Sequence, residues 1–315
     1  MSNQKSKPLN EIVETYVYHV LDSTSRNNQT SAYTNLLLKS LIDHLEFINK
    51  QFSLSVDFKS IRRFVVYRDI KSTNNYKPRG ITPHYLERVI QIAAPSHLLN
   101  PFKGGDFIKN RNFIIVMLFF ETGIRIGELM SLTVDSVSEI NHSFYLEVSD
   151  KHVVNDTRFS KGKIKNNFSY RHIAISKELF LVIQHYISSL RGKLHCDNNL
   201  LLVSWHGRPL SKHSIHHIFD ALSKTAERKI SQGKKLVPHD FRYAFANNFL
   251  SYLIGERGIS IQKAMDELRV IMGWSIDSPM PQKYASDYIQ LLADRENILR
   301  INASYKDANI QFPKN

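Results

Sequence analysis

The sequence has little cysteine and no long apolar run. Of its 315 residues, one is cysteine, at position 196, so an intrachain disulfide and a cysteine-based zinc site are excluded. The longest uninterrupted apolar run covers residues 113–120, whereas a membrane-spanning helix needs about 20 residues. The N-terminal residues 1–8 are polar and lack the apolar core of a secretory signal. These absences favour a reducing, cytoplasmic setting, and we expect no contact with a membrane.

The short motifs of nucleotide-binding and metal-dependent enzymes are also missing. The sequence contains no GxxxxGK[ST] phosphate loop, no GxGxxG turn, no His-Glu-x-x-His pair and no Gly-x-Ser-x-Gly elbow. His213, His216 and His217 have helical spacing, so two imidazoles could share one helix face. No obvious carboxylate or fourth ligand accompanies them, and a solvated face is therefore favoured over a metal site.

Acidic residues are fewer than basic ones over the whole length. The chain has 42 Lys and Arg against 29 Asp and Glu, a net charge of +13. Residues 1–80 have 12 basic and 7 acidic side chains, so the excess is not confined to one tail. A basic body of this kind suggests a polyanionic partner, most simply nucleic acid. The alternative is a surface charge that only keeps the protein in solution.

The length and the apolar content of 42% predict two folded domains. Residues 71–83 combine polar residues, glycine and two prolines, which is typical of a linker. Before it, apolar residues at helical spacing predict helices over residues 9–21 and 30–52, and a shorter one around 61–66. We therefore predict an all-α domain over residues 1–78 and a second domain over residues 84–315.

The second domain is predicted to be mainly α with a small antiparallel β-sheet. Thr82 and Pro83 can open a helix, because proline suits the first helical position. A further helix, apolar nearly all round, is expected over residues 112–132. Alternating apolar residues predict strands over 143–148 and 170–175, separated by a long polar segment. Further helices are predicted over residues 177–190, 211–223, 241–253, 260–272 and 291–299.

Several polar residues lie in apolar surroundings, where a charge must be paired or must face a ligand. Arg125 directly follows the apolar run, and Glu128 is three residues further on, at helical spacing for a salt bridge. His239 and Arg242 are three residues apart at a predicted helix start, where anions are favoured. Such residues could hold an anionic group.

Taken together, these residues resemble the motifs of the tyrosine recombinases, also called phage integrases. The resemblance covers about residues 84–300, and the predicted N-terminal domain is similar to the core-binding domain of that family. The family's Lys-Thr-x-x-Ser-x-Arg pattern is matched here with Asn166 in place of threonine. The motifs follow one another as Thr122-Gly-Ile-Arg-Ile-Gly-Glu-Leu129, Lys165-Asn-Asn-Phe-Ser-Tyr-Arg171, His239-Asp-Phe-Arg242, Gly273-Trp274 and Tyr284.

The resemblance implies DNA strand exchange through a covalent 3′-phosphotyrosyl intermediate, with Tyr284 as the nucleophile. His239 would accept the phenolic proton, and Lys165 would protonate the leaving 5′-oxygen as general acid. Lys161 and Lys163 are neighbours that could take the place of Lys165. Because Tyr284 follows Trp274 by ten residues rather than nine, Tyr288 is kept as a second candidate for the nucleophile.

The resemblance also assigns the groups that would bind the phosphate. Arg125 and Arg242 would offer forked, charge-assisted donors to its non-bridging oxygens, and Glu128 would orient Arg125. The family commonly has histidine where this chain has Trp274, whose indole N–H can donate a hydrogen bond but cannot transfer a proton. The phosphotyrosyl link conserves the bond energy, so we expect no ATP, no metal, no other cofactor and no small-molecule substrate.

The implied partners are double-stranded DNA and further copies of the chain. The two domains would hold the duplex between them, and four copies would assemble on two paired sites. A C-terminal segment, with a helix over residues 291–299 and a tail over 310–315, would dock on a neighbouring copy. We expect a site-specific recombinase or integrase of a mobile element, nucleoid-associated in the cytoplasm. The alternatives are a DNA-binding regulator or architectural protein with a decayed site, and a topoisomerase-like enzyme.

Overall fold

The computed structural model describes residues 31–52, 83–162, 167–230 and 235–307, together with Thr15, Tyr16 and His19. The chain divides into two compact units, Met1–Lys77 and Pro78–Asn315. In the first unit, the helix predicted over residues 30–52 is present as α2 (Ser31–Phe52), which buries Leu38 and Ile42. The predicted helix around residues 61–66, most of that over 9–21 and residues 71–82 of the predicted linker lie outside the described residues.

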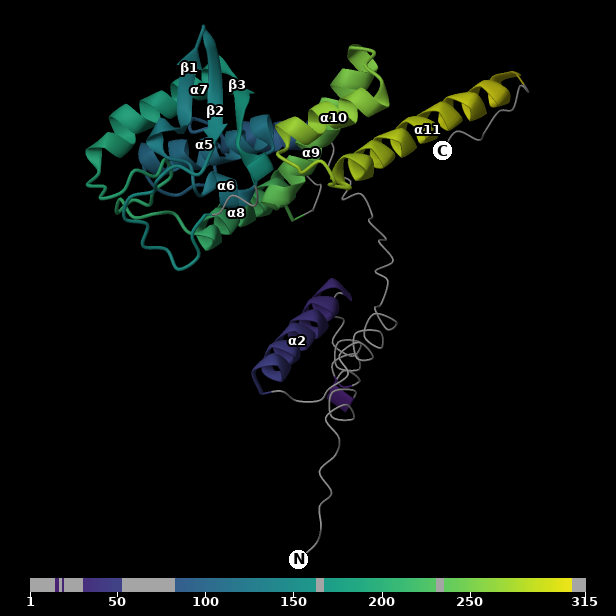
Figure 1. Ribbon diagram of the computed structural model, residues 1–315. Helices are drawn as coiled ribbons and strands as arrows, with labels where there is room; N and C mark the ends of the chain where they lie inside the picture. Colours follow the sequence, from purple (N-terminus) through teal and green to yellow (C-terminus); the bar gives the residue numbers. More distant parts are fainter. Residues whose placement is uncertain are drawn as a thin grey trace, which may run out of the picture. The chain divides into compact units, whose positions relative to one another are not determined.

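The second unit is mainly helical and has one small antiparallel sheet, which confirms the predicted fold class (Figure 1). No helix among the described residues is long and apolar enough to cross a membrane. The described elements of this unit are α4 (Pro83–Ala93), α5 (Asp106–Thr122), α6 (Ile126–Leu129), β1 (Val137–Ile140), β2 (Ser143–Val148), β3 (Arg171–Ile175), α7 (Lys177–His185), α8 (Lys212–Ile230), α9 (Pro238–Ser251), α10 (Ile261–Ile271) and α11 (Met280–Asp307).

The single helix predicted over residues 112–132 is wrong, because the chain breaks between α5 and α6. α5 begins earlier, at Asp106, and ends at Thr122. Gly123 follows with φ of +56°, a left-handed conformation that favours glycine, and its N–H donates to Phe119 O. A Cβ at this position would lie 2.7 Å from the ring of Phe245. The break directs Arg125, the residue before α6, away from the line of α5.

The three strands form a sheet in the order β1-β2-β3. The predicted strands over residues 143–148 and 170–175 are confirmed as β2 and β3, which pair antiparallel with Leu146 opposite Ile173. β1 was not predicted, because Val137 and Ile140 at its ends do not give the alternation of a half-buried strand. The sheet thereby places Arg171 at the start of β3.

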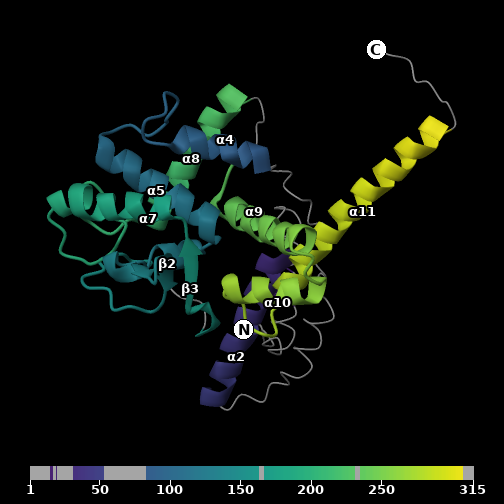
Figure 2. The same ribbon diagram turned by 90° about the horizontal axis from the view of Figure 1, so that it is seen from above.

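α9 begins at Pro238, three residues before the predicted start, so that His239 and Arg242 lie in its first two turns. Proline at the first position supplies a fixed φ and lacks the N–H that a helix start would leave unpaired. The N–H of Val237 donates to Asp240 Oδ2 at 2.8 Å, which fixes the entry of the chain. α11 includes the predicted helix over residues 291–299, and its C-terminal half projects from the other helices (Figures 1 and 2).

Two hydrophobic cores make up the second unit. The larger one lies among α4, α5, α7, α8 and the sheet, and includes Phe119 packed edge-on against Phe219. The smaller one joins α9, α10 and α11 through Leu250, Leu268 and Met272. α9 contributes to both, since Phe241 belongs to the first core and Leu250 to the second. The candidate functional residues lie where these cores meet.

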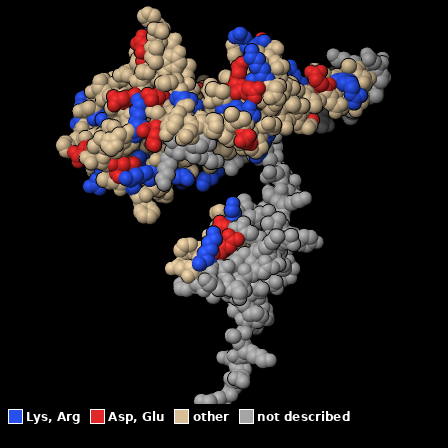
Figure 3. Space-filling model, viewed as in Figure 1, with Lys and Arg blue, Asp and Glu red and all other residues tan. Residues whose placement is uncertain are grey.

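Basic and acidic side chains are interspersed on the face of the second unit shown in Figure 3, without one dominant basic patch. The charge excess of the sequence is therefore not gathered on this face.

Replacing Ile115 with alanine tests the larger core. Ile115 is fully buried in α5, so the loss of its side chain should lower the free energy of unfolding by about 2–5 kcal/mol. Both tryptophans, Trp205 and Trp274, belong to the second unit, so urea unfolding followed by tryptophan fluorescence reports on this unit. Leu181→Ala is the control, because its side chain on α7 is exposed. An equal loss for both variants would contradict the assignment of the core.

Candidate active site

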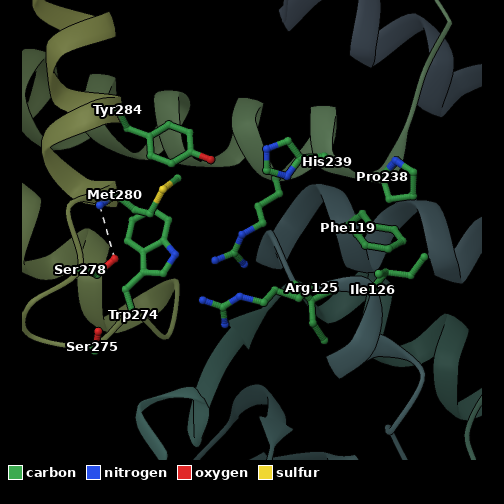
Figure 4. Close-up of a pocket in the computed structure, with 12 residues that line it drawn as sticks. Phe119, Arg125, Ile126, Pro238, His239, Trp274, Ser275, Ser278, Met280 and Tyr284 are labelled. Atoms are coloured by element: carbon green, nitrogen blue, oxygen red, sulfur yellow. Dashed lines mark hydrogen bonds between the residues drawn. The ribbon is translucent and has the colours of Figure 1, made fainter. Parts of the chain in front are cut away.

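A pocket of about 400 Å³ lies between the two cores (Figure 4). In Figure 4 the side chains of Arg125, His239, Trp274 and Tyr284 converge on it from three separate parts of the chain. Five of the predicted site residues, Arg125, His239, Arg242, Trp274 and Tyr284, come together here, although about 160 positions separate the first from the last. The pocket is lined by Phe119, Ile124, Arg125, Ile126, Pro238, His239, Arg242, Trp274, Ser275, Ser278, Met280 and Tyr284.

Three guanidinium groups converge on the C-terminal end of α10. The last carbonyls of a helix have no partner within the helix and carry partial negative charge, so cations are favourable beside them. Each of three consecutive carbonyls at this end accepts from a different arginine. The hydrogen bonds run from Arg171 Nε to Ile271 O at 2.7 Å, from Arg242 Nη2 to Met272 O at 2.8 Å and from Arg125 Nη2 to Gly273 O at 2.9 Å.

Glu128 supplies the negative charge of this cluster. Its side chain is fully buried and accepts from the Nη1 and backbone N–H of Arg125 and from Arg171 Nη2. Burial alone would raise the pKa of Glu128, but the charges and hydrogen bonds of Arg171 and Arg125 outweigh it and hold that pKa below its ordinary value. The predicted pairing with Arg125 is present. The anchoring part of Arg171 was not predicted, although its Ser-x-Arg pattern was recognised.

Arg242 is the most enclosed cation of the pocket, with 6% of its surface exposed. Its Nη1 donates to Gly123 O, and its guanidinium carbon lies 5.5 Å from the centre of the Trp274 ring, a cation–π contact. Burial and the repulsion of Arg125 lower the pKa of Arg242 to about 9. The guanidinium is therefore still protonated at neutral pH and is available to an anion.

Gly273 gives the chain the turn that brings Trp274 to the pocket. Its φ is +61°, and the N–H of Trp274 donates to Arg269 O at 3.0 Å, which closes the end of α10. A Cβ on Gly273 would lie 2.7 Å from Arg171 Nη1 and 3.1 Å from the Cα of Ser169. Glycine is thus required both by the backbone conformation and by the close approach of β3.

Tyr284 lies in the second turn of α11 and is 2% exposed. Its ring stacks on Trp274, with centroids 5.4 Å apart and planes at 18°, and also contacts Tyr243. Figure 4 shows its hydroxyl directed across the pocket toward His239. Tyr288 is also buried but does not line the pocket, and its hydroxyl lies beside Gly255. The geometry therefore favours Tyr284 over Tyr288 as the residue that reaches a ligand there.

His239 is exposed at the start of α9, one helical turn before Arg242, and both line the pocket as their spacing predicted. The first backbone N–H groups of a helix have no partner within the helix and favour anions. His239 therefore adds a ring donor or acceptor to a place that already favours negative charge.

The structure describes only part of the predicted motif Lys165–Arg171 and of the lysines before it. Lys163 and Lys165 lie outside the described residues, and Lys161 is exposed. The motif's serine, Ser169, is buried, and its Oγ accepts a long hydrogen bond of 3.4 Å from Arg125 Nη1. Ser169 and Arg171, which follow the lysines in the sequence, thus contact Arg125 and Glu128.

The histidines of α8 lie apart from this pocket. His213 and His217 share one exposed face, with their Nε2 atoms 2.7 Å apart, as their spacing predicted. No group of three or more side chains that could hold a metal ion occurs among the described residues.

Comparisons with known proteins bear on this fold and site. Residues 82–290 match the model of the phage integrase family. Tyrosine recombinase XerD of Halalkalibacterium halodurans is 29% identical over 167 residues, which cover 52% of this chain and 49% of that protein. Tyrosine recombinase XerD of Staphylococcus haemolyticus is 24% identical over 272 residues, which cover 76% of this chain and 84% of that protein. The chain thus spans about half the length of the first of these relatives and most of the second.

Two solved structures are similar in fold. The XerH site-specific recombinase bound to a palindromic difH substrate has a TM-score of 0.65 at 15% identity, covering 91% of this chain and 72% of that one. The Tn1549 transposon integrase in complex with a circular intermediate DNA has a TM-score of 0.62 at 16% identity, covering 94% and 89%. At these identities the likeness establishes the architecture alone.

The depressed pKa of Glu128 predicts a specific loss of stability in acid. A carboxylate whose folded-state pKa is below its unfolded value contributes stability that is complete above the unfolded value and is lost as the pH falls through the folded one. Glu128→Gln should therefore lower the free energy of unfolding by about 3 kcal/mol at pH 7, because the buried Arg171 and the partly buried Arg125 lose their anionic partner. As the pH falls below 4.5, the wild-type curve should begin to approach that of the variant.

Urea unfolding at a series of pH values checks this expectation. Glu296→Gln is the control, since its side chain on α11 is exposed, and it should follow the wild type throughout. A Glu128→Gln curve that runs parallel to the wild type down to pH 3 would rule out the ion-paired carboxylate.

Proposed function

Because the chain belongs to the phage integrase family, we propose that it is a tyrosine recombinase that breaks and rejoins DNA through Tyr284. The observation that carries this proposal is the pocket in which Arg125, Arg242, His239, Trp274 and Tyr284 meet. Two cations and an indole N–H would face a phosphodiester there, and a phenol would attack it. This combination suits a reaction whose transition state gathers negative charge on the non-bridging oxygens of phosphorus.

The two arginines would bind the scissile phosphate. Arg125 and Arg242 are held by backbone carbonyls, and a guanidinium has five N–H donors. The carbonyl contacts of Arg242 use two of its three nitrogens, which keeps the group fixed while leaving donors for phosphate oxygens. Trp274 would add its indole N–H to the same oxygens.

The reaction would proceed by exchange of one phosphodiester for another. The Tyr284 Oη attacks phosphorus, a new P–O bond forms to the phenol, and the bond from phosphorus to the 5′-oxygen breaks. The phenolic proton passes to His239, and a proton from Lys165 goes to the leaving 5′-oxygen. The reverse reaction with a new 5′-hydroxyl rejoins the strand. Because the phosphotyrosyl link conserves the bond energy, ATP is not consumed.

The substrate would be double-stranded DNA, to which each of the two predicted domains, over residues 1–78 and 84–315, would contribute contacts. Of the two similar solved structures, the XerH recombinase is bound to a palindromic difH substrate and the Tn1549 transposon integrase to a circular intermediate DNA. We place this chain with the integrases of mobile elements, acting on the nucleoid in the cytoplasm. Much of its affinity would come from phosphate contacts and fall steeply with salt.

Assembly of several copies on DNA would use the end of α11. Ile298 and Leu299 are exposed by 57% and 53%, on a part of the helix that projects from the unit (Figure 2). Exposed apolar side chains on a projecting helix are suited to dock on another copy. Four copies on two paired sites would exchange these segments.

Tyr284→Phe should abolish covalent attachment to DNA while leaving binding unchanged. Phenylalanine keeps the stacking on Trp274 and removes only the nucleophilic oxygen. The measurement is trapping on a nicked duplex made from the flanking DNA of the gene, read as a slow band on a denaturing gel. Tyr288→Phe is the matched control and should form the adduct at the wild-type level. An adduct with Tyr284→Phe would show that another residue is the nucleophile. If the wild type bound all flanking duplexes but formed no adduct with any of them, the catalytic site would be a decayed one.

The paired substitution of Ile298 and Leu299 by aspartate should prevent assembly without preventing binding to one site. Sedimentation on DNA with one or two sites separates the two properties. The paired substitution of Asn297 and Asn302 by aspartate is the control, because it adds the same charge at exposed polar positions of the same helix. Equal assembly by both double variants would contradict docking through this segment.

A further inference from the structure

An aromatic stack beside the pocket begins and ends on α9. The guanidinium of Arg242 lies over the Trp274 ring, which stacks on Tyr284 with centroids 5.4 Å apart. The Tyr284 ring in turn contacts the ring of Tyr243, with centroids 5.3 Å apart and planes at 42°. Arg242 and Tyr243 are consecutive residues of α9. Two neighbouring positions of one helix therefore hold both ends of this stack.

Tyr243 contacts Tyr284 from outside the pocket. It is partly buried and packs against the smaller core, and the residues that line the pocket include Tyr284 but not Tyr243. Contacts with Tyr243 and Trp274 help to bury the Tyr284 ring, so that 2% of that residue is exposed. A phenol ring turns about two side-chain torsions, and packing against two rings from different elements restricts both. These contacts thus fix the direction of the Tyr284 hydroxyl.

The helix that carries Tyr243 also carries two residues of the proposed site. Arg242 and Tyr243 follow His239 by three and four positions, so the three side chains leave the same side of α9. One rigid helix thereby relates the ring that contacts the nucleophile to the expected phosphate ligand and the expected proton acceptor. Reacting atoms must approach within about 3–3.5 Å in a defined direction, and a displacement of about 1 Å can cost about a hundredfold in rate.

We propose that Tyr243 is a positioning residue that holds the Tyr284 phenol toward the scissile phosphate, an inference that rests on the proposed function. The ring of Tyr243 performs this role, because its contact with Tyr284 is made between rings. It acts on the step in which the Tyr284 Oη attacks phosphorus and the bond from phosphorus to the 5′-oxygen breaks. DNA binding depends on other groups and does not need this ring.

Replacing Tyr243 with leucine and with phenylalanine separates the ring from the hydroxyl. Leucine keeps an apolar side chain against the core but has no flat ring, whereas phenylalanine keeps the ring. Single-turnover adduct formation on the nicked duplex at saturating protein gives the rate of attack, and mobility shift gives the Kd for the same duplex. Tyr243→Met, with a long and flexible apolar side chain, takes the place of the leucine variant if that variant does not fold.

Nitration by tetranitromethane reports the position of the Tyr284 ring without any DNA. The reagent reacts with accessible phenols, so the buried Tyr284 should react slowly in the wild type. Tyr243→Leu should speed this nitration by about two- to tenfold, the range expected from the loss of one aromatic pair. Tyr288 lies in the same tryptic peptide and is the internal reference, whose rate should not change.

Phe249→Leu is the matched control. Phe249 also lies on α9 and is partly buried against the same core, but its ring stacks on Phe245, with centroids 6.0 Å apart. Its replacement removes one aromatic ring from the same helix and the same core without removing a ring that contacts Tyr284. Any general loosening of this core should therefore affect both leucine variants alike.

Tyr243→Leu should slow adduct formation by about tenfold or more and leave the Kd within about twofold of the wild type. Tyr243→Phe and Phe249→Leu should keep both the rate of attack and the nitration of Tyr284 at wild-type values. The positioning role would be overturned by no loss of rate in Tyr243→Leu, by an equal loss in Phe249→Leu, or by an equal loss in Tyr243→Phe. Faster nitration of Tyr288 together with Tyr284 would also overturn it.

Failure of the proposed function would look different. If the wild type formed no adduct, the proposed function would fail, whereas the nitration rates would still show whether Tyr243 holds the Tyr284 ring.

Discussion

The active-site architecture depends on the three guanidinium groups that bind consecutive carbonyls at the C-terminal end of α10 and directly after it. Each comes from a different place in the chain, and each takes one of three consecutive carbonyls. These contacts join the larger core to the smaller one, because α10 packs with α9 and α11, whereas Arg125 directly precedes α6 and Arg171 begins β3. Buried cations are costly unless they are paired, so the two cores are held in the arrangement that satisfies all three. The turn at Gly273 then places Trp274, and stacking on Trp274 places Tyr284.

The same network explains how the pocket would favour a phosphate. Of the three arginines, Arg125 and Arg171 bind the one buried carboxylate, Glu128, and Arg242 binds carbonyls, so the cluster of these four side chains keeps an excess of positive charge. Backbone carbonyls also hold all three guanidinium groups in place, and backbone atoms are less mobile than the ends of side chains. Donors that are fixed before the substrate arrives need no rearrangement in the transition state, which is the main source of electrostatic catalysis. On this account Arg171 and Glu128 support the chemistry without facing the ligand. Burying their charges costs free energy, and building the site requires that cost.

Much of the fold and the site could be predicted from the sequence, and the omissions have physical reasons. The ordered motifs predicted that Arg125, His239, Arg242, Trp274 and Tyr284 would act together, and apolar periodicity predicted α2, β2 and β3. The break after α5 was missed because the left-handed turn at Gly123 is coupled to Phe245, more than 100 residues away. The anchoring part of Arg171 was missed because its partners include backbone carbonyls, which have no signature in a sequence. The α9 start was placed late because Pro238 was not counted as helical.

The central claim is that this network presents Tyr284, and no other residue, to the phosphate. The most direct test is to trap the covalent complex, digest the DNA with nuclease and the protein with trypsin, and map the attached nucleotide by mass spectrometry. Cleavage after Lys283 and Arg295 yields one peptide that contains both Tyr284 and Tyr288, so fragmentation must separate the two. The account predicts that the nucleotide is attached to Tyr284. Attachment to Tyr288, or to any residue outside the pocket, would contradict it.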